Sequence, residues 1–338
     1  MAQQTGALTL AAWSKTVKDP IEKGVMLGVA IEGVVADLLP WRNVNSLQIS
    51  GFRYDEVLVG EYVPIDGDIP SGYVEGKPLQ YSIYAYKMHI DIPYELVKYD
   101  ANQLEPAVKR QFTMAERGVA YVVNDRFING DQAVDPFTFN GIAKLVTELD
   151  TNRQIVGSTE LDITTYSSTV AQDILDRIHE GMHKVEGHLP TAGFANSDFL
   201  LKFESILRRE QVAGNDYNWA EKALQVDDPR RTQRTASTRP ALVYRGVPFY
   251  DLGTKEDLST LVIGNSYAEA GSAGATRVFF VKIGDEDLEG LQGEPLSIKL
   301  VAETLHDRDV QRYRLRWTHG LANWGPRSIV MVRGIKVV

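Results

Sequence analysis

The chain has 338 residues, too many for one small hydrophobic core and enough for two lobes. It contains no cysteine, which excludes disulfides and thiolate chemistry, and its net charge of −9 argues against general nucleic-acid binding through phosphate neutralisation. We expect no signal peptide. We also expect no membrane-spanning segment, because the most apolar window, residues 21–39, contains four charged side chains.

Residues 1–45 are predicted to form an extended arm with short helical pieces rather than a compact domain. Asp19 followed by Pro20 is typical of a helix start, because a carboxylate at the N-cap and a proline in the first turn both suit it. Pro40 marks the end of this helical stretch.

Residues 46–92 are predicted to form a long two-stranded hairpin with arms at 46–64 and 79–92 and a polar tip at 66–77. The apolar residues of the return arm are first odd-numbered and then even-numbered: Leu79, Tyr81 and Ile83, then Tyr86, Met88, Ile90 and Ile92. Because a strand alternates faces with period two, this change predicts a bulge, a strong twist, or different partners at the two ends. An isolated ribbon is marginal in water, so we expect its outer half to rest on another copy of the chain.

A long helix is predicted from Asn102 to Gly130. Asn102 and Glu105 form a capping-box-like pair, and Gly130 supplies a C-terminal stop. Apolar residues then recur at helical spacing along one face: Leu104, Val108, Phe112, Ala115, Val119, Val122, Val123 and Phe127. Such a helix spans about 40 Å, which is longer than usual in globular proteins.

The rest of the chain is a mixed region in which helices come first and a run of strands follows. We predict helices over 168–186 and 197–210 with a strand over 190–196 between them, then a polar irregular segment over 211–240. Short strands are predicted over 247–252, 261–263, 277–283, 296–303, 309–317 and 328–338. The fold class is therefore α+β.

One motif indicates enzyme chemistry. His179-Glu180-Gly181-Met182-His183 matches H-E-x-x-H, in which two histidines bind zinc and the glutamate acts on bound water. The apolar stripe of the surrounding helix places His179 about 100° and His183 about 140° from its centre. Both histidines then lie on the helix flank or in solvent rather than in a cleft. A zinc-dependent hydrolase is therefore only a distant alternative.

Two basic clusters are candidates for contacts with an anionic partner. Arg312, Arg314 and Arg316 alternate with apolar residues, so one strand face carries only arginine. Such a row is repulsive unless anions lie opposite, and the alternatives are ordinary cross-strand pairs, nucleic acid, or acidic residues of a neighbouring copy. For the last case we considered Asp285, Glu286, Asp287 and Glu289. The second cluster is Arg230, Arg231, Arg234 and Arg239, within the polar segment.

The order of parts resembles the major capsid proteins of tailed bacteriophages, which have the Hong Kong ninety-seven-type capsid fold. Phe137–Ile142 is similar to the turn after that family's spine helix, and Gly246–Phe249 to its G-x-P strand entry. The resemblance implies an N-terminal arm (1–45), an extended hairpin loop (46–92), a peripheral domain with the spine helix (93–142), an axial domain (143–302) and C-terminal strands that return to both domains (303–338).

The resemblance also implies a structural protein rather than an enzyme, without metal or cofactor. Its copies would assemble in the host bacterial cytoplasm into hexamers and pentamers of an icosahedral phage head, the virion capsid. The implied partners are scaffold, portal and decoration proteins and packaged double-stranded DNA, bound non-specifically. Encapsulin shells share the fold and are the close alternative. We expect these residues to contact other subunits: Asp66, Asp68, Tyr73, Glu75, Lys77, Arg230, Arg231, Arg234, Arg312, Arg314 and Arg316.

Overall fold

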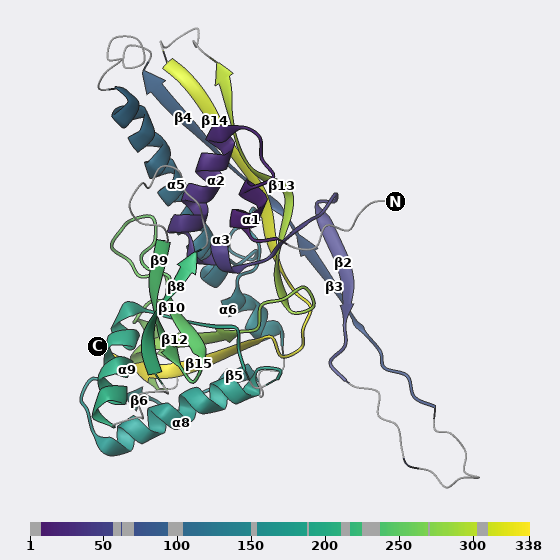
Figure 1. Cartoon of the computed structure of the whole chain (residues 1–338). Helices are drawn as coiled ribbons and strands as arrows, with labels where there is room; N and C mark the ends of the chain where they lie inside the picture. Colours follow the sequence, from purple (N-terminus) through teal and green to yellow (C-terminus); the bar gives the residue numbers. More distant parts are fainter. Residues whose placement is uncertain are drawn as a thin grey trace.

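The computed structural model describes residues 8–56, 62, 71–93, 104–149, 154–187, 189–210, 217–224, 237–269, 271–302 and 310–338. Within these residues the strands form a four-stranded sheet, a larger nine-stranded sheet and a two-stranded ribbon, with helices packed beside the sheets (Figure 1). This mixture of helices and strands confirms the predicted α+β class.

The described helices are α1 (Leu10–Ser14), α2 (Pro20–Glu32), α3 (Val34–Leu38), α5 (Leu104–Asn129), α6 (Ile142–Leu145), η1 (Val146–Glu148), α8 (Ser168–Lys184) and α9 (Ser197–Arg209). The strands are β1 (Trp41–Asn43), β2 (Gln48–Arg53), β3 (Lys77–Ser82), β4 (Tyr84–Pro93), β5 (Ile155–Val156), β6 (Leu161–Asp162), β7 (Ala192–Ala195), β8 (Tyr217–Leu224), β9 (Ser237–Tyr244), β10 (Val247–Asp251), β11 (Tyr267–Glu269), β12 (Ser272–Val281), β13 (Leu288–Ala302), β14 (Val310–Asn323) and β15 (Ile329–Lys336).

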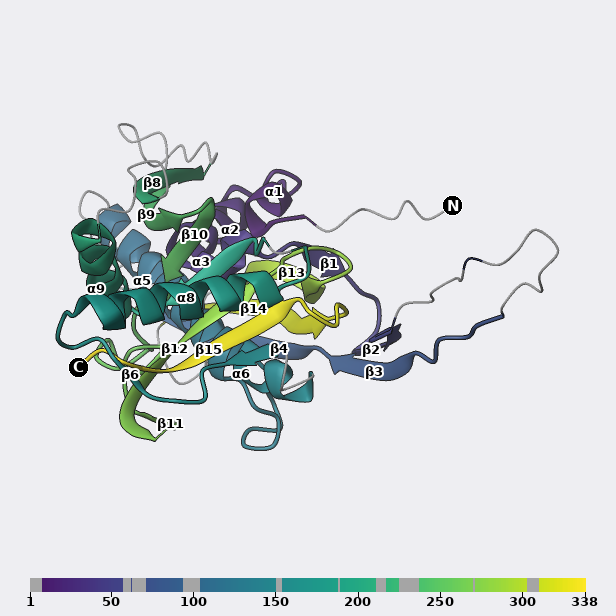
Figure 2. The ribbon, with the colours of Figure 1, turned by 90° about the horizontal axis from the view of Figure 1, so that it is seen from below.

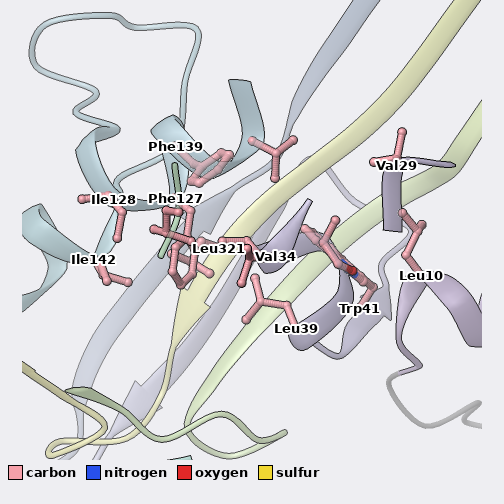
Figure 3. Close-up of a cluster of buried hydrophobic side chains, with 14 of the residues drawn as sticks. Leu10, Val29, Val34, Leu39, Trp41, Phe127, Ile128, Phe139, Ile142 and Leu321 are labelled. Carbon is pink, nitrogen blue, oxygen red and sulfur yellow. The ribbon is translucent and has the colours of Figure 1, made fainter. Parts of the chain in front are cut away.

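The N-terminal residues differ from the predicted extended arm. The Asp19 side chain accepts a hydrogen bond from the Ile21 N–H and starts α2, as predicted. The helices that follow are packed on the subunit's own core, because their apolar side chains lie among those of later elements (Figure 3). The buried side chains shown there are Leu10, Val29, Val34, Leu39 and Trp41 together with Phe127, Ile128, Phe139, Ile142 and Leu321. Residues 8–45 therefore belong to the subunit core.

The return arm of the predicted hairpin is two strands. β3 pairs with β2, whereas β4 pairs with β14 over ten residues, from Tyr84 opposite His319 to Pro93 opposite Val310. The strand breaks at Ile83, where the apolar residues change from odd-numbered to even-numbered positions. The prediction of different partners at the two ends is confirmed. The apolar side chains of both strands nevertheless pack against the same core.

Helix α5 is the longest described helix, with 26 residues and a length of about 39 Å. It lies along the four-stranded sheet, ordered β1-β13-β14-β4, and Phe112 packs edge-to-face on Tyr313 of β14 with ring centroids 5.2 Å apart. The helix ends one residue before Gly130, as predicted. A side chain at Gly130 would collide with the carbonyl oxygen of Phe139, so this glycine permits a close backbone approach. The predicted N-cap, Asn102, lies outside the described residues.

The larger sheet, ordered β5-β15-β12-β7-β10-β9-β8, separates two hydrophobic clusters. Phe279 of β12 faces the cluster that contains α5, and its neighbour Phe280 faces the cluster under α8 and α9. Helices α8 and α9 and strand β7 lie where the sequence predicts them. None of the described helices is long and apolar enough to cross a membrane.

Two predictions in this half of the chain are wrong. The segment 211–240 contains strands β8 and β9, which pair antiparallel and continue into β10 through a turn. Arg245 and Gly246 have φ of 49° and 81°, the left-handed conformation of a two-residue hairpin turn. Residues 261–263 do not form a strand, because only Leu261 makes an isolated bridge, to Thr254. Val262 and Ile263 are buried in irregular backbone, which explains their apolar character.

Candidate assembly surfaces

The inner end of the β2–β3 ribbon is fixed to the subunit. The Tyr81 hydroxyl donates a hydrogen bond of 2.5 Å to the carbonyl oxygen of Asn323, and its ring packs edge-to-face on Trp324 at 5.1 Å. Burial raises the pKa of Tyr81 to about 12. Gly51 lies directly under the Trp324 ring, where a side chain would collide with the indole. These contacts anchor the inner end of the ribbon to the end of β14 and the residue that follows it.

The outer end of the ribbon projects away from the body of the subunit (Figure 2). Phe52 is 62% exposed and the predicted contact residue Tyr73 is 88% exposed. Glu75 is also exposed, whereas Lys77 forms an ion pair of 2.5 Å with Asp55 in its own chain. Asp66 and Asp68 lie outside the described residues. The ribbon is thus fixed at its root, and aromatic side chains are exposed toward its outer end.

Beside the ribbon root lies a groove of about 640 Å³ that sequence reasoning missed. Phe52, Trp324 and the exposed carboxylates Asp285 and Glu286 line it. Two other acidic residues considered as contacts for a neighbouring copy already have partners in the chain. Asp287 pairs with Lys282 at 3.0 Å, and Glu289 is buried and accepts a hydrogen bond of 2.7 Å from the Trp324 indole. In the sequence, the aromatic residues of the ribbon strands were the only indication of this groove.

The arginine row lies on β14, as the sequence predicts, and two of its three members have partners. Arg312 makes a two-pronged ion pair with Asp91 of β4, at 2.6 and 2.5 Å. Arg316 lies 3.3 Å from Glu294 of β13. Arg314 is exposed and makes no ion pair within the described residues. Ordinary cross-strand pairs therefore account for part of the row. Arg230, Arg231 and Arg234 lie outside the described residues.

The H-E-x-x-H motif lies on α8, and His179 and Glu180 contact other side chains of the chain. The His179 ring stacks on Tyr244 of β9, and Nε2 is hydrogen-bonded to the tyrosine hydroxyl at 2.6 Å. Burial, followed by the nearby Arg245, lowers the pKa of His179. Glu180 pairs with Lys184 at 2.9 Å, and His183 is exposed. His179 is thus half-buried between helix and strand, with its Nε2 bonded to Tyr244. Among the described residues no group of His, Asp or Glu side chains is placed to hold a metal ion.

Comparisons with known proteins match the chain by structure and not by sequence. No family model and no curated protein sequence matches it. An encapsulin complex from Synechococcus elongatus PCC 7942 superimposes with a TM-score of 0.57 and 15% identity, covering 89% of this chain and 86% of that one. The capsid of a native GTA particle gives a TM-score of 0.54 and 11% identity, covering 90% of both chains. Microbacterium phage Oxtober96 gives 0.53 and 12%, covering 89% and 90%.

These similar structures span nearly the whole chain and include capsids and an encapsulin. At such identities the likeness concerns the fold. It agrees with the order of elements described above, in which the β2–β3 ribbon precedes the long helix α5 and most strands of the two sheets follow it. The chain has the Hong Kong ninety-seven-type capsid fold.

Proposed function

We propose that the chain is a shell protein whose copies assemble into a closed icosahedral particle. The observation that carries the proposal is the β2–β3 ribbon, which is fixed at Tyr81 and Trp324 and ends in the exposed aromatic residues Phe52 and Tyr73. In a monomer this apolar surface would face water at a cost of roughly 25 cal/mol for each Å². A neighbouring copy that covers it recovers this free energy, and the gain is repeated in every copy of the shell.

Within this class we propose the head of a tailed double-stranded DNA phage, with scaffold and portal proteins as assembly partners. Decoration proteins and non-specifically bound DNA are further proposed partners, and assembly would take place in the bacterial cytoplasm. The chain would act through assembly and conformational rearrangement, not through catalysis. An encapsulin-type nanocompartment is the second candidate, because an encapsulin is among the similar structures with a TM-score above 0.5.

The contents of the particles separate the two candidates. Purified chain, with its scaffold if one is needed, should form closed particles of uniform size in negative-stain micrographs. Particles recovered from the native source and treated with nuclease should protect double-stranded DNA if they are phage heads. An encapsulin shell would instead enclose a protein cargo and no protected DNA.

Truncation of the ribbon tests the residue-level basis of the proposal. Replacing residues 66–76 by a short glycine linker leaves β2, β3 and the Tyr81 anchor in place. We expect this variant to lose particle formation and to keep its circular dichroism spectrum and melting temperature. Particles of normal size from the truncated chain would remove the ribbon from the assembly mechanism.

A further inference from the structure

A pocket of about 270 Å³ lies between helices α8 and α9. It is at the end of the subunit away from the ribbon, where the segment that follows β6 meets the two helices (Figure 2). Buried apolar side chains line its inner part, namely Ile163, Ala171 and Ile206. Thr165 and Tyr166 are exposed, so solvent reaches the pocket. Its volume is close to the lower limit for pockets that bind small molecules.

Two contacts join the segment before α8 to α9 around this pocket. Lys202 Nζ donates a hydrogen bond of 3.0 Å to the carbonyl oxygen of Thr164. The Tyr166 hydroxyl donates one of 2.6 Å to the Glu210 carboxylate, and the guanidinium of Arg209 lies over the tyrosine ring, 4.7 Å from its centroid. The walls are therefore held in place by the subunit itself. A ligand that enters such a preformed pocket does not have to order its walls.

The described residues that line the pocket provide two cations, Lys202 and Arg209, and no carboxylate. Neither cation makes an ion pair within the described part of the chain. The carboxylate of Glu204, on the same helix, is engaged by Arg208 at 2.5 Å. The Lys202 ammonium is half-buried, and its bond to a carbonyl uses one of its three N–H donors. Because a partly buried cation without a counter-ion is unfavourable, the pocket favours an anion.

Hydroxyl groups supply further donors beside the two cations. Thr165, Ser167 and Ser205 line the pocket, and Ser205 is half-buried on α9. The Ser167 oxygen accepts a hydrogen bond from the Val170 N–H, so its own O–H remains available to donate. A phosphate group has three strong acceptor oxygens and close to two negative charges at pH 7. Two cations with several hydroxyl donors therefore suit a phosphate better than a carboxylate, which has two oxygens and one charge.

We propose that this pocket binds a small phosphate monoester. Lys202 and Arg209 neutralise the phosphate group, and the hydroxyls of Thr165, Ser167 and Ser205 donate hydrogen bonds to its oxygens. The apolar inner part of the pocket contacts the carbon atoms of the ester. A bound ligand joins the start of α8 to α9 and stabilises the helix layer of the larger sheet. The pocket is built from one subunit, so this inference does not depend on the proposed function.

Binding measurements on the full chain, kept unassembled at low protein concentration, test the proposal. The probes are glycerol 3-phosphate and inorganic phosphate, with glycerol and acetate as controls, in isothermal titration calorimetry and thermal melting at about 0.15 M salt. Lys202→Met and Arg209→Gln each remove one cation. Ser205→Phe fills the pocket without a change of charge. Arg208→Gln is the matched control, because it removes an exposed cation of α9 that does not line the pocket.

We expect glycerol 3-phosphate to bind at one site per chain with a Kd below about 1 mM and to raise the melting temperature. Inorganic phosphate should compete for this site, whereas glycerol and acetate should not bind. Each cation variant should weaken binding at least about tenfold, and Ser205→Phe should abolish it. Arg208→Gln should bind like the wild type. Melting temperatures without ligand confirm that every variant is folded.

Three results would overturn the proposal. The first is the absence of saturable binding of glycerol 3-phosphate to the folded wild type. The second is equal weakening by Arg208→Gln and Arg209→Gln, or unchanged binding in Ser205→Phe, because the anion would then respond to the charge of α9 and not to the pocket. The third is binding of acetate or of inorganic phosphate that is as tight as that of the ester.

Discussion

Part of the acid sensitivity of the subunit should come from one buried histidine. His319 of β14 is fully buried, its ring stacks on Trp317 at 4.3 Å, and Nδ1 has no hydrogen-bond partner among the described residues. Burial lowers its pKa from 6.5 to about 4, so the ring is neutral in the folded protein at pH 7. The perturbation is His319→Phe, which keeps a flat ring beside Trp317 and removes the titration.

The sign and size of the effect follow from the two pKa values. The unfolded chain takes up a proton below pH 6.5, whereas the folded chain resists it until about pH 4, so stability is lost as the pH falls between these values. At pH 4.5 the loss from this group amounts to about 2.5 kcal/mol, and below pH 4 it approaches its limit of about 3.4 kcal/mol. At pH 7 it is close to zero.

The assay is urea unfolding of wild type and His319→Phe from pH 7.5 to pH 4.5, in conditions that keep the protein unassembled. The difference between the two proteins cancels the titration of all other groups. We expect the variant to gain about 2.5 kcal/mol relative to the wild type over this range, with an unchanged urea dependence. Parallel pH curves for the two proteins would refute the account of a neutral buried histidine.

Further predictions concern α8 and the glycines of the long helices. Gly181→Ala should destabilise the subunit by about 1–3 kcal/mol in urea unfolding, because its Cβ would lie 2.6 Å from Val332. Gly118→Ala on α5 is the matched comparison, since nothing lies within 4 Å, and should stabilise by about 0.5–1 kcal/mol. An equal sign for both would contradict this packing. His179→Ala should lower stability by about 1 kcal/mol without changing zinc content in elemental analysis, whereas stoichiometric zinc in the wild type would revive the hydrolase alternative.

The elements with strong helical periodicity and clear caps were predictable. Helices α8 and α9 begin at Ser167 and Asn196, whose side chains accept hydrogen bonds from Val170 N–H and Phe199 N–H. Such signals are local, so the sequence contains them in full. The parity change around Ile83 was equally informative, because the two faces of a strand are specified by neighbouring residues.

Strand β13 shows why other elements were not predictable. The sequence predicts its start near residue 296, because glycine and proline in the preceding residues argue against a strand. In the structure the strand already begins at Leu288. Gly290 lies under the Trp41 indole, where a Cβ would come within 2.5 Å, and the register shifts between Gln292 and Glu294. Gly290 is required by its contact with Trp41, which lies 249 positions away in the chain. No local sequence pattern encodes such a contact.

The same distinction between local and long-range signals applies to the candidate surfaces. The alternation along β14 identified the arginine row, since it depends only on neighbouring positions. The partners Asp91 and Glu294 depend on the register of β14 against two other strands, and Asp91 is 221 residues from Arg312. The only local signal for Asp91 was its odd-numbered position in β4, on the strand face opposite the even-numbered apolar residues. The outer hairpin and the second arginine cluster remain predictions.

Particle formation by the purified chain tests the central claim most directly. Wild-type protein, alone and with its scaffold, is concentrated at neutral pH and about 0.15 M salt and examined by electron microscopy and analytical ultracentrifugation. We expect closed shells of uniform diameter that contain pentamers and hexamers of this chain. A stable monomer under every condition, with the β2–β3 ribbon still projecting into solvent, would contradict the account.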